Sequence, residues 1–451
     1  MSQLIPPQQL LSLLKCFAPC FTRPSFRYFV SFIVAMIAAT ERLTTTTVYR
    51  LSGQVGHYTN VSRFLSAYRW TVGELSQRLL SLLVQRLGLW RDDQRRPRLC
   101  LVLDETIVEK SSKRMYGVAW QRNTHGGLCR GTHILGHYWL MLGVLLRVGS
   151  RTLCFPLGFR LYRQKKRCPK GKYRTPTELA VALLKSLRWP EDPDIVRTVV
   201  GDAGFADKEL LRWCAANGFE VIVRGRMDAR VHDIYVRQPK PLRGRPRKYG
   251  EKICLRAYAQ NERNFKQTIY LYQDGTEARV ASVVGLHRAS GLPVRFVIVR
   301  CPHKDDVVIM SLDLGLTPRE ITALYADRFA IEMTFRELKQ HFGLGHYQVR
   351  KPEAILRHVH LSGIACALTQ LLTLCPVRGG ICEGLLHPRV MPWRKQGTAI
   401  SVHETQMLLR RACELEGTFA LVEQTGGHIN KSALAAGAQH AQHLTAKSAE
   451  L

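Results

Sequence analysis

The sequence lacks several features that would place the protein in common classes. Its 13 cysteines include no Cys-x-x-Cys pair, and none has His or Cys partners at zinc-finger spacing. We therefore expect reduced thiols rather than a disulfide framework or a structural zinc. The most apolar run that we identify, Tyr28–Ala39, is shorter than the roughly 20 residues of a membrane-spanning helix. The N-terminus also lacks the basic start and small-residue cleavage site of a secretory signal.

Acidic residues are scarce compared with basic ones. Lys and Arg number 66 against 35 Asp and Glu, which gives a formal net charge of +31 at pH 7. This excess indicates a polyanionic partner, and nucleic acid is favoured over membrane because no spanning run was found. A chain of 451 residues with 46% hydrophobic content can form two or three structural units with a large core. We expect a cytoplasmic protein with no membrane partner.

Hydrophobic periodicity predicts an α/β protein whose parts differ in pattern. Apolar residues at helical spacing fill the N-terminal part, and the next part follows the order of three strands, a helix, a strand, a helix and a strand. A region rich in Val, Ile and Tyr then predicts an antiparallel β insertion, before helices return. The expected parts are 1–95, helical; 96–224, mixed-sheet core; 225–316, β insertion; 317–375, the last part of the core; and 376–451, a helical C-terminal region with a disordered tail.

Local signals place the ends of several elements. Thr175-Pro-Thr-Glu178 and Thr317-Pro-Arg-Glu320 match the capping-box pattern, in which Thr and Glu satisfy the first amides of a helix. Gly218 is placed to end the helix that begins at Lys208. We expect one strand of the insertion at 252–258. The helix that begins after Thr317 is expected to continue through Lys339.

The segment from Tyr325 to Lys339 has an unusual charge distribution. At 100° per residue, Tyr325, Arg328, Glu332, Arg336 and Lys339 project within a sector of about 80°. A solvated helix would scatter such charges or pair opposite signs at four-residue spacing. Cations on both sides of one acid suit an extended anionic ligand whose reacting atom lies near Glu332. An ordinary charged, exposed face is the alternative.

Two aspartates follow apolar strands directly. Asp104 follows Leu99–Leu103 and Asp202 follows the strand at 195–200, and strand ends in α/β sheets are where open sites form. Clustered acids repel unless a cation lies between them. Carboxylates suit Mg²⁺ or Mn²⁺, and a pair of such ions can promote in-line displacement at phosphorus. Asp104, Asp202 and Glu332 are therefore the candidate metal ligands, and a helix cap or turn is the alternative role for each aspartate.

Other residues near Asp104 are less specific. Glu105 is expected to point to the opposite side of the strand and to have a supporting or structural role. His125, His133 and His137 follow in a segment predicted as loop and strand, so we interpret them as ordinary core or surface histidines.

The spacing Tyr-x2-Arg-x3-Glu-x6-Lys, occupied by Tyr325, Arg328, Glu332 and Lys339, resembles the YREK signature of bacterial insertion-sequence transposases of the DDE type. Asp104 in Leu-Val-Leu-Asp-Glu-Thr and Asp202 in Val-Val-Gly-Asp-Ala-Gly-Phe are similar to the first and second acids of that family. The resemblance covers roughly residues 96 to 350.

This resemblance implies a fold, an activity and partners. The fold would be an RNase H-like core interrupted by a β-rich insertion between the second Asp and the Glu. The activity would be cutting at transposon ends and joining of the freed 3′-hydroxyl to target DNA, using two Mg²⁺ or Mn²⁺ ions. The partners would be terminal inverted repeats and target DNA, bound by a homodimer at the bacterial nucleoid. The helices of 1–95 are expected to bind DNA.

Three groups of residues are expected to contact that DNA. Beside Glu332, the candidates are Tyr325, Arg328, Arg336 and Lys339. A second group lies in the loop Arg160–Arg174, which has eight cations and no acid, and includes Lys165, Lys166 and Arg167. The third is in Leu242–Gly250, which resembles an AT-hook core and includes Arg243, Arg245, Arg247 and Lys248. Minor-groove and simple phosphate contact remain open for the third group.

Two other functions remain open. One is an RNase H-like endonuclease that cuts DNA without joining it. The other is a DNA-binding regulator derived from a transposase that has lost its chemistry. The intact set of three acids argues against the second.

Overall fold

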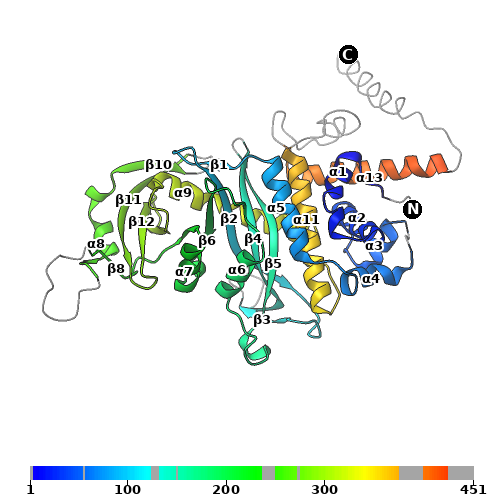
Figure 1. Ribbon diagram of the computed structural model, residues 1–451, viewed down its shortest axis with the longest axis horizontal. Helices are drawn as coiled ribbons and strands as arrows, with labels where there is room; N and C mark the ends of the chain where they lie inside the picture. Colours follow the sequence, from blue (N-terminus) through cyan, green and yellow to red (C-terminus); the bar gives the residue numbers. More distant parts are fainter. Residues whose placement is uncertain are drawn as a thin grey trace, which may run out of the picture.

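The structure is a computed structural model that describes residues 4–53, 56–122, 132–148, 151–235, 249–271, 275–374 and 400–424. In Figure 1 a long twisted sheet runs from the left to the centre, and a bundle of helices forms the right-hand end. His125, the AT-hook-like residues Arg243, Arg245, Arg247 and Lys248, and the C-terminal tail lie outside the described residues.

All strands of the described chain join one mixed sheet, in the order β3-β4-β2-β6-β7-β13-β12-β11-β8-β9, with β5 on β4, β1 on β2 and β10 on β11. The strands are β1 Trp90–Arg91, β2 Pro97–Glu109, β3 Ala119–Arg122, β4 His133–Val148, β5 Arg151–Tyr162, β6 Val196–Gly201, β7 Phe219–Arg224, β8 Val231–His232, β9 Lys252–Ile253, β10 Gln267–Leu271, β11 Thr276–His287, β12 Leu292–Arg300 and β13 Val307–Ser311. The predicted α/β class is confirmed, and the architecture is consistent with an RNase H-like core.

Parallel pairing occurs at the centre of this sheet. β2 pairs with β6 in parallel, and β6 pairs with β7 in parallel, whereas β4 runs antiparallel to β2. Leu99–Leu103 of β2 form a continuous apolar run, and Val199 and Val200 of β6 are also completely buried, as is usual for parallel strands that are covered on both faces. The core order predicted from the sequence is found as β2, β4, β5, α6 (Pro176–Lys185), β6, α7 (Lys208–Ala216) and β7.

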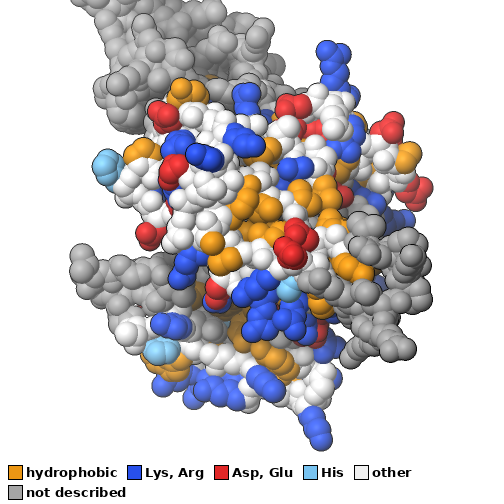
Figure 2. Space-filling view, turned by 90° about the vertical axis from the view of Figure 1, so that its left-hand side faces the viewer, with side chains coloured by type: hydrophobic (Ala, Val, Ile, Leu, Met, Phe, Trp, Pro, Cys, Tyr) orange, Lys and Arg blue, Asp and Glu red, His pale blue; other side chains and the backbone are white. Residues whose placement is uncertain are grey.

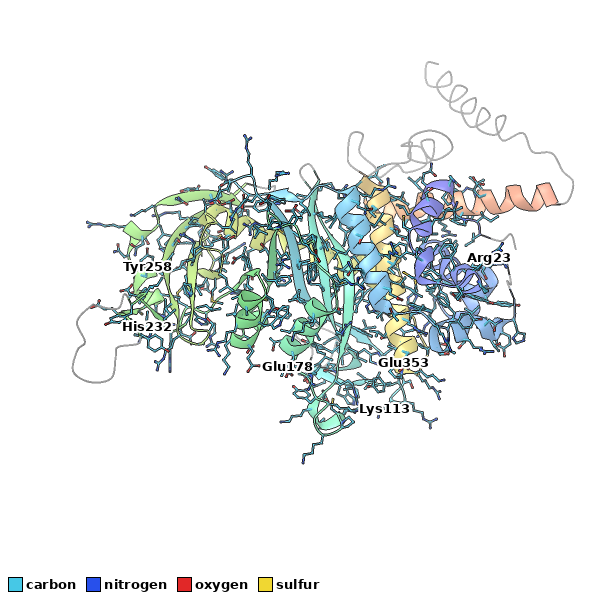
Figure 3. All side chains as sticks on the ribbon, viewed as in Figure 1. Arg23, Lys113, Glu178, His232, Tyr258 and Glu353 are labelled. Carbon is cyan, nitrogen blue, oxygen red and sulfur yellow. The ribbon has the colours of Figure 1, made fainter. Side chains whose placement is uncertain are left out.

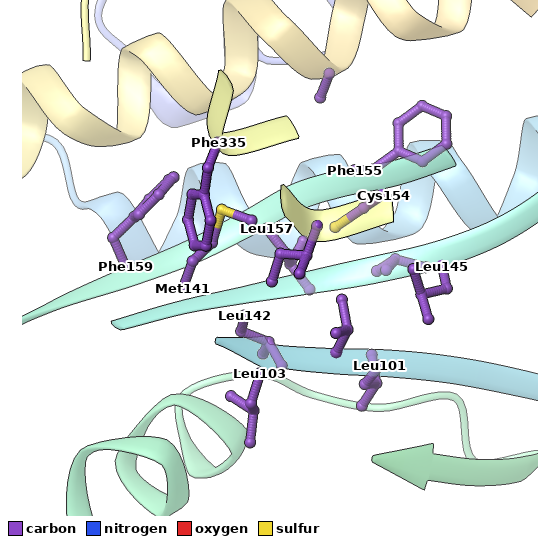
Figure 4. Close-up of a cluster of buried hydrophobic side chains, with 14 of the residues drawn as sticks. Leu101, Leu103, Met141, Leu142, Leu145, Cys154, Phe155, Leu157, Phe159 and Phe335 are labelled. Carbon is purple, nitrogen blue, oxygen red and sulfur yellow. The ribbon is translucent and has the colours of Figure 1, made fainter. Parts of the chain in front are cut away.

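Helices cover the two faces of the core. α6 packs on β4 and β5 and α7 on β7, while α5 (Val72–Arg86), α10 (Ala330–Gln340) and α11 (Pro352–Leu374) pack on β5. Figure 4 shows Phe335 of α10 pointing toward Met141 and Phe159 of the strands beneath it. Close approach of α11 depends on Gly363, since a Cβ there would lie 2.7 Å from the Phe159 ring.

The N-terminal helices pack around α11 and the C-terminal helix. They are α1 Gln8–Lys15, α2 Arg23–Ala38, α3 Thr45–Leu51, α4 Tyr58–Ser66 and α5, with α13 at Val402–Gln424. α2 contacts both α11 and α13, and it carries the apolar run noted in the sequence. Phe29, Phe64 and Trp70 are buried in the aromatic cluster that joins α2 to α4.

The insertion differs from the expectation in two ways. First, the strand expected at 252–258 is wrong: β9 stops at Ile253, and α8 (Leu255–Gln260) follows because Leu255 and Ala259 are four residues apart and both buried. Second, β13 pairs antiparallel with β7, so the insertion continues the core sheet. The sequence pattern predicts strands and the loops between them, but it does not show which strand of the insertion pairs with the core sheet.

The helix expected from Thr317 through Lys339 is also interrupted. α9 (Pro318–Asp327) ends before Arg328, and α10 begins at Ala330. Between them the amides of Arg328 and Phe329 donate to Tyr325 and Ala326, three residues back rather than four. This tighter turn rotates α10 relative to α9. Both predicted capping boxes, at Thr175 and Thr317, are confirmed.

The helix that the sequence predicts after Pro352 is confirmed as α11, and it is longer and more continuously apolar than the run at Tyr28–Ala39. α11 is long and apolar enough to cross a membrane by length and composition, yet 89% of its most apolar window is buried inside the protein. The described cysteines are free thiols, as expected. The apolarity of α11 therefore reflects its position as a core helix, with the sheet on one side and the N-terminal bundle on the other.

A buried polar group fixes α10 to the core. The Thr334 hydroxyl and the Gln370 amide both donate to the Cys154 carbonyl, at 2.8 and 3.1 Å, and Gln370 also donates to Glu337 at 3.3 Å. Burial raises the pKa of Glu337 to about 7, against partial offsets from Gln370, Cys366 and Arg151. Folding therefore favours the protonated acid between about pH 4.5, its ordinary value, and pH 7.

This gives a first prediction. The folded state binds the extra proton, so the contribution of Glu337 is most favourable below about pH 4.5 and is lost as pH rises to about 7. Glu337→Gln should therefore raise the free energy of unfolding at pH 8 more than at pH 5, by at most about 3 kcal/mol. Urea unfolding at the two pH values measures this, with the exposed Glu353→Gln as the control. Equal effects of Glu337→Gln at both pH values would contradict the assignment.

Candidate active site

Six residues predicted from the sequence as metal ligands or DNA contacts line one open cavity of about 510 Å³. The cavity lies where β2 and β6 meet α10. Its lining residues are Asp104, Glu105, Thr106, Asp202, Arg328, Glu332, Phe335, Arg336, Lys339 and Gln340. The structure thus brings together three acids that are far apart in sequence, together with three of the predicted cations.

The register of two parallel strands places the two aspartates side by side. Leu103 of β2 is the partner of Gly201 of β6, and the next residues of these neighbouring strands are Asp104 and Asp202. Asp202 Oδ1 accepts from the Gly204 amide at 2.8 Å, which caps the short helix η3 (Ala203–Phe205). Asp202 therefore does have the helix-capping role considered as the alternative, and it also lines a cavity that contains other acids.

Arg328 links the strand acid to the helix acid. Its Nη1 donates to Asp104 Oδ2 at 2.8 Å, and its Nη2 donates to Glu332 Oε1 at 3.4 Å. The Arg328 and Asp104 side chains are only 17% and 16% exposed, whereas Glu332 is 47% exposed. Asp104 Oδ1 also accepts from the Glu105 amide at 2.8 Å. The Arg328 guanidinium thus lies between two carboxylates that the sequence analysis predicts to be ligands of divalent metal ions.

Burial and mutual repulsion change the acidity of the strand carboxylates. Burial raises the pKa of Asp104 to about 6; the Glu105 amide and Arg328 oppose this, and Asp202 and Glu332 add to it. Burial also raises the pKa of Glu105 to about 7, with Asp202 as the next cause. Acids that raise one another's pKa in this way are relieved when a cation binds among them.

Glu105 is the residue that the sequence interpretation undervalued. It was expected to point away from Asp104, yet it lines the same cavity, and its carboxylate interacts with Tyr138. The ladder between β2 and β6 ends at Leu103, so among the described strands β2 is paired only with β4 at Asp104 and Glu105, and the β6 side is open to the cavity. The strand does continue through both acids to Glu109, and the only sequence signal for Glu105 is that it directly follows Asp104.

The remaining predicted DNA-contacting residues are distributed over different places. Tyr325 does not line the cavity, but its ring centroid is 5.7 Å from the Arg328 guanidinium carbon. Lys165, Lys166 and Arg167 form the short helix η2 and are exposed, outside the cavity lining. His133 is exposed, and His137 is buried against the Tyr347 hydroxyl at 2.7 Å, as ordinary histidines would be.

Positive charge gathers over much of one end of the molecule. Figure 2 looks at the end formed by the insertion, and its lower half is dominated by Lys and Arg side chains, whereas most acids lie in the upper half. Such segregation matches a polyanion that contacts the lower edge of the sheet.

Comparison with known families agrees with this geometry. The sequence profile of the DDE superfamily endonucleases matches residues 16–279, more than half of the chain. The protein therefore belongs to the DDE superfamily endonuclease family, whose members act on DNA and generally use divalent metal ions. The match includes Asp104 and Asp202 and ends before Glu332. A search of the curated proteins found no match.

The carboxylate oxygens of the site are suitable ligands for a divalent ion, but in the present arrangement they are not close enough together to bind one. As the described side chains stand, no three His, Cys, Asp or Glu lie close enough together to hold a metal ion. The guanidinium of Arg328 instead stands in for a cation between Asp104 and Glu332. The donors are all carboxylate oxygens, which suit Mg²⁺ or Mn²⁺, and an ion would require Arg328 to release Asp104.

This arrangement predicts competition between Arg328 and a divalent ion. Arg328→Ala should bind Mn²⁺ several-fold more tightly in the absence of DNA, because no guanidinium has to be displaced. The metal-free variant should also lose about 1–3 kcal/mol of stability, because Asp104 loses a charged hydrogen-bond partner. Titration calorimetry and thermal unfolding measure the two effects.

Arg336→Ala is the matched control for this experiment. Arg336 lines the same cavity and, within the described part of the chain, has no ion pair with these acids. Mn²⁺ affinity that stays the same or weakens in Arg328→Ala would show that the guanidinium does not occupy the ion's place.

Proposed function

We propose that the protein is a DNA transposase of the insertion-sequence type, which cuts transposon ends and joins the freed 3′-hydroxyls to target DNA. The observation that supports this most is the presence of Asp104, Asp202 and Glu332 around one cavity, with a cation between two of them. The YREK spacing through Tyr325, Arg328, Glu332 and Lys339 adds the resemblance to transposases rather than to nucleases in general.

Asp104, Asp202 and Glu332 are the proposed ligands of two Mg²⁺ or Mn²⁺ ions. Such ions, when bound, would activate a water or a 3′-hydroxyl and stabilise the leaving oxygen. Glu105 and Asp202 repel each other electrostatically, so the negative charge of Glu105 would favour the binding of cations at the site.

The cations beside Glu332 are the proposed grip on the DNA backbone. Arg336 and Lys339 line the cavity and are exposed, so phosphate oxygens can reach them. Arg328, once released from Asp104, would offer a planar fork to a phosphate next to the cut. Tyr325 lies against Arg328 and would limit the positions that its guanidinium can adopt.

The proposed reaction needs no external energy source. In the first step a water oxygen attacks a phosphodiester, one P–O bond forms, and the bond to the 3′-oxygen breaks. The attacking water gives up one proton, and the 3′-oxygen gains one. In the second step this 3′-hydroxyl attacks a target phosphodiester, so one P–O bond again replaces another.

The same proposal includes the partners and the location of the protein. It would bind terminal inverted repeats as a homodimer on DNA, at the bacterial nucleoid.

Asp202 offers the sharpest test of the chemistry. Asp202→Asn should abolish cleavage of DNA ends and leave duplex binding within about twofold, because Asn keeps the oxygen that caps Gly204 and loses only the charge. The matched control is Asp207→Asn, since Asp207 caps α7 in the same manner outside the cavity. Loss of binding and cleavage together in Asp202→Asn would assign the residue a folding role.

A strand-transfer assay separates the proposal from its alternatives. Joined product supports a transposase, and cut product alone supports the endonuclease that the family description names. Bound but unchanged DNA would identify a regulator without chemistry. The oligonucleotides should carry the inverted repeats that flank the coding region.

The grip on phosphate gives a further prediction. Lys339→Ala should weaken duplex binding and reduce the slope of log K against log salt by about 0.9, the effect of one phosphate contact. Lys208→Ala, an exposed lysine at the start of α7, is the control. An unchanged slope for Lys339→Ala in a salt titration by fluorescence anisotropy would exclude this contact.

A further inference from the structure

Three hollows of the surface follow one another from the acids to the N-terminal helices. The active-site cavity ends at Lys339 and Gln340. Gln340 also lines a second hollow of about 340 Å³, which passes Arg42 and reaches Leu43. Leu43 in turn lines a third hollow of about 540 Å³, which extends to Lys351. Each hollow shares a lining residue with the next, so the three lie in a row on the surface, and we call this row the groove.

The floor of this groove is fixed by hydrogen bonds between distant parts of the chain. His346 Nδ1 accepts from the Leu43 amide at 3.0 Å, which ties the segment after α10 to the linker between α2 and α3. The buried Lys110 ammonium donates to the Gly345 and Tyr347 carbonyls. The groove therefore belongs to the folded core and does not depend on a loose loop.

The lining of the groove has the chemistry of a phosphate-binding surface. Its third hollow combines two exposed cations with many hydroxyls: Arg350, Lys351, Thr44, Thr45, Thr46, Ser62 and Ser66. Arg42 is exposed in the second hollow. Glu41 is the acid in the lining of these two hollows, and it forms an ion pair with Arg50. Hydroxyl and basic side chains are the groups that bind DNA phosphates without reading sequence.

The far end of the groove adjoins the basic loop that follows β5. The Tyr116 amide donates to the Arg350 carbonyl, and Arg163 donates to the Tyr116 hydroxyl at 2.7 Å. Arg163 also donates to the Arg167 carbonyl, at the end of η2. Figure 3 shows Lys113 and Glu353, which flank this junction in sequence, at the same lower edge of the molecule. The cations of 163–174 thus extend the positive surface beyond Arg350.

We infer that double-stranded DNA leaves the acids along this groove, with its backbone bound by Arg42, Arg350, Lys351 and the hydroxyls of α3 and α4. The inference rests on the proposed function, since it names the path of the same substrate. It assigns the N-terminal helices a surface for DNA: the side of α3 and α4 that faces Arg350.

The test compares salt dependence of DNA binding. The probe is a fluorescein-labelled duplex of mixed sequence, about 30 base pairs or roughly 100 Å long, because phosphate contacts do not require a particular sequence. The double variant Arg350→Ala with Lys351→Ala should bind about tenfold or more weakly at 150 mM salt. Its slope of log K against log salt should fall by about 1.8, for two lost phosphate contacts.

A matched double variant controls for the loss of charge. Arg23 and Arg27 are exposed cations of α2 that do not line the groove, so replacing both by Ala should leave the slope unchanged. Thr46→Glu provides an independent variant, since it adds a negative charge to the groove at an exposed position, and it should weaken binding by a similar factor. Thermal unfolding of each variant confirms that the fold is retained.

The outcomes separate this inference from the proposed function. If Arg350→Ala with Lys351→Ala keeps the full slope while Arg336→Ala with Lys339→Ala lowers it, the groove is wrong and the active site stands. Equal losses in the groove variant and the Arg23 and Arg27 control would also overturn the groove, because charge alone would explain them. If the unaltered protein does not bind the duplex at all, both the groove and the transposase proposal fail.

Discussion

The parallel ladder between β2 and β6 is the constraint on which the site depends. Its register pairs Leu103 with Gly201, so the next residue of each strand is an aspartate at the same level of the sheet. A shift of one residue in this pairing would move every side chain of β2 to the opposite face and separate the two acids. The register is held by completely buried residues on both strands, among them Leu101, Leu103 and Val199. The chemistry of the site is thus specified by hydrophobic packing.

Arg328 shows how such a site can be stable without its ions. Acids that share a cavity repel, and the raised pKa values of Asp104 and Glu105 express that cost. A guanidinium hydrogen-bonded to Asp104 and Glu332 supplies a positive charge that belongs to the chain itself. Arg328 is also a proposed phosphate ligand. Its guanidinium would therefore bind Asp104 and Glu332 in the absence of DNA and a phosphate group when DNA is bound.

Much of the core could be predicted from the sequence because its signals are local. Apolar runs, Thr-Pro-x-Glu caps and Gly218 each describe a single element, and the structure confirms those elements, although β2 continues past Asp104 to Glu109. Predictions failed where the outcome depended on tertiary pairing. β13 pairs with a distant strand, Leu255 and Ala259 are buried in the tertiary fold, and Arg328 at the tight turn is bound to the distant Asp104. For the same reason the place of Glu105 in the cavity and the groove at Arg350 could not be derived from spacing alone, and the roles of all these residues stay predictions.

The continuity of the sheet has a mechanical consequence. Ile222, Val223 and Arg224 of β7 are partners of β13, so the insertion is joined to the core by a ladder of backbone hydrogen bonds rather than by a flexible hinge. A swing of the insertion would have to break several of these bonds together. A load applied to β11 or β12 is instead transmitted through β13 and β7 to β6, whose last residue directly precedes Asp202. Strain imposed on the outer strands would thus produce a small displacement of Asp202, one of the proposed catalytic acids.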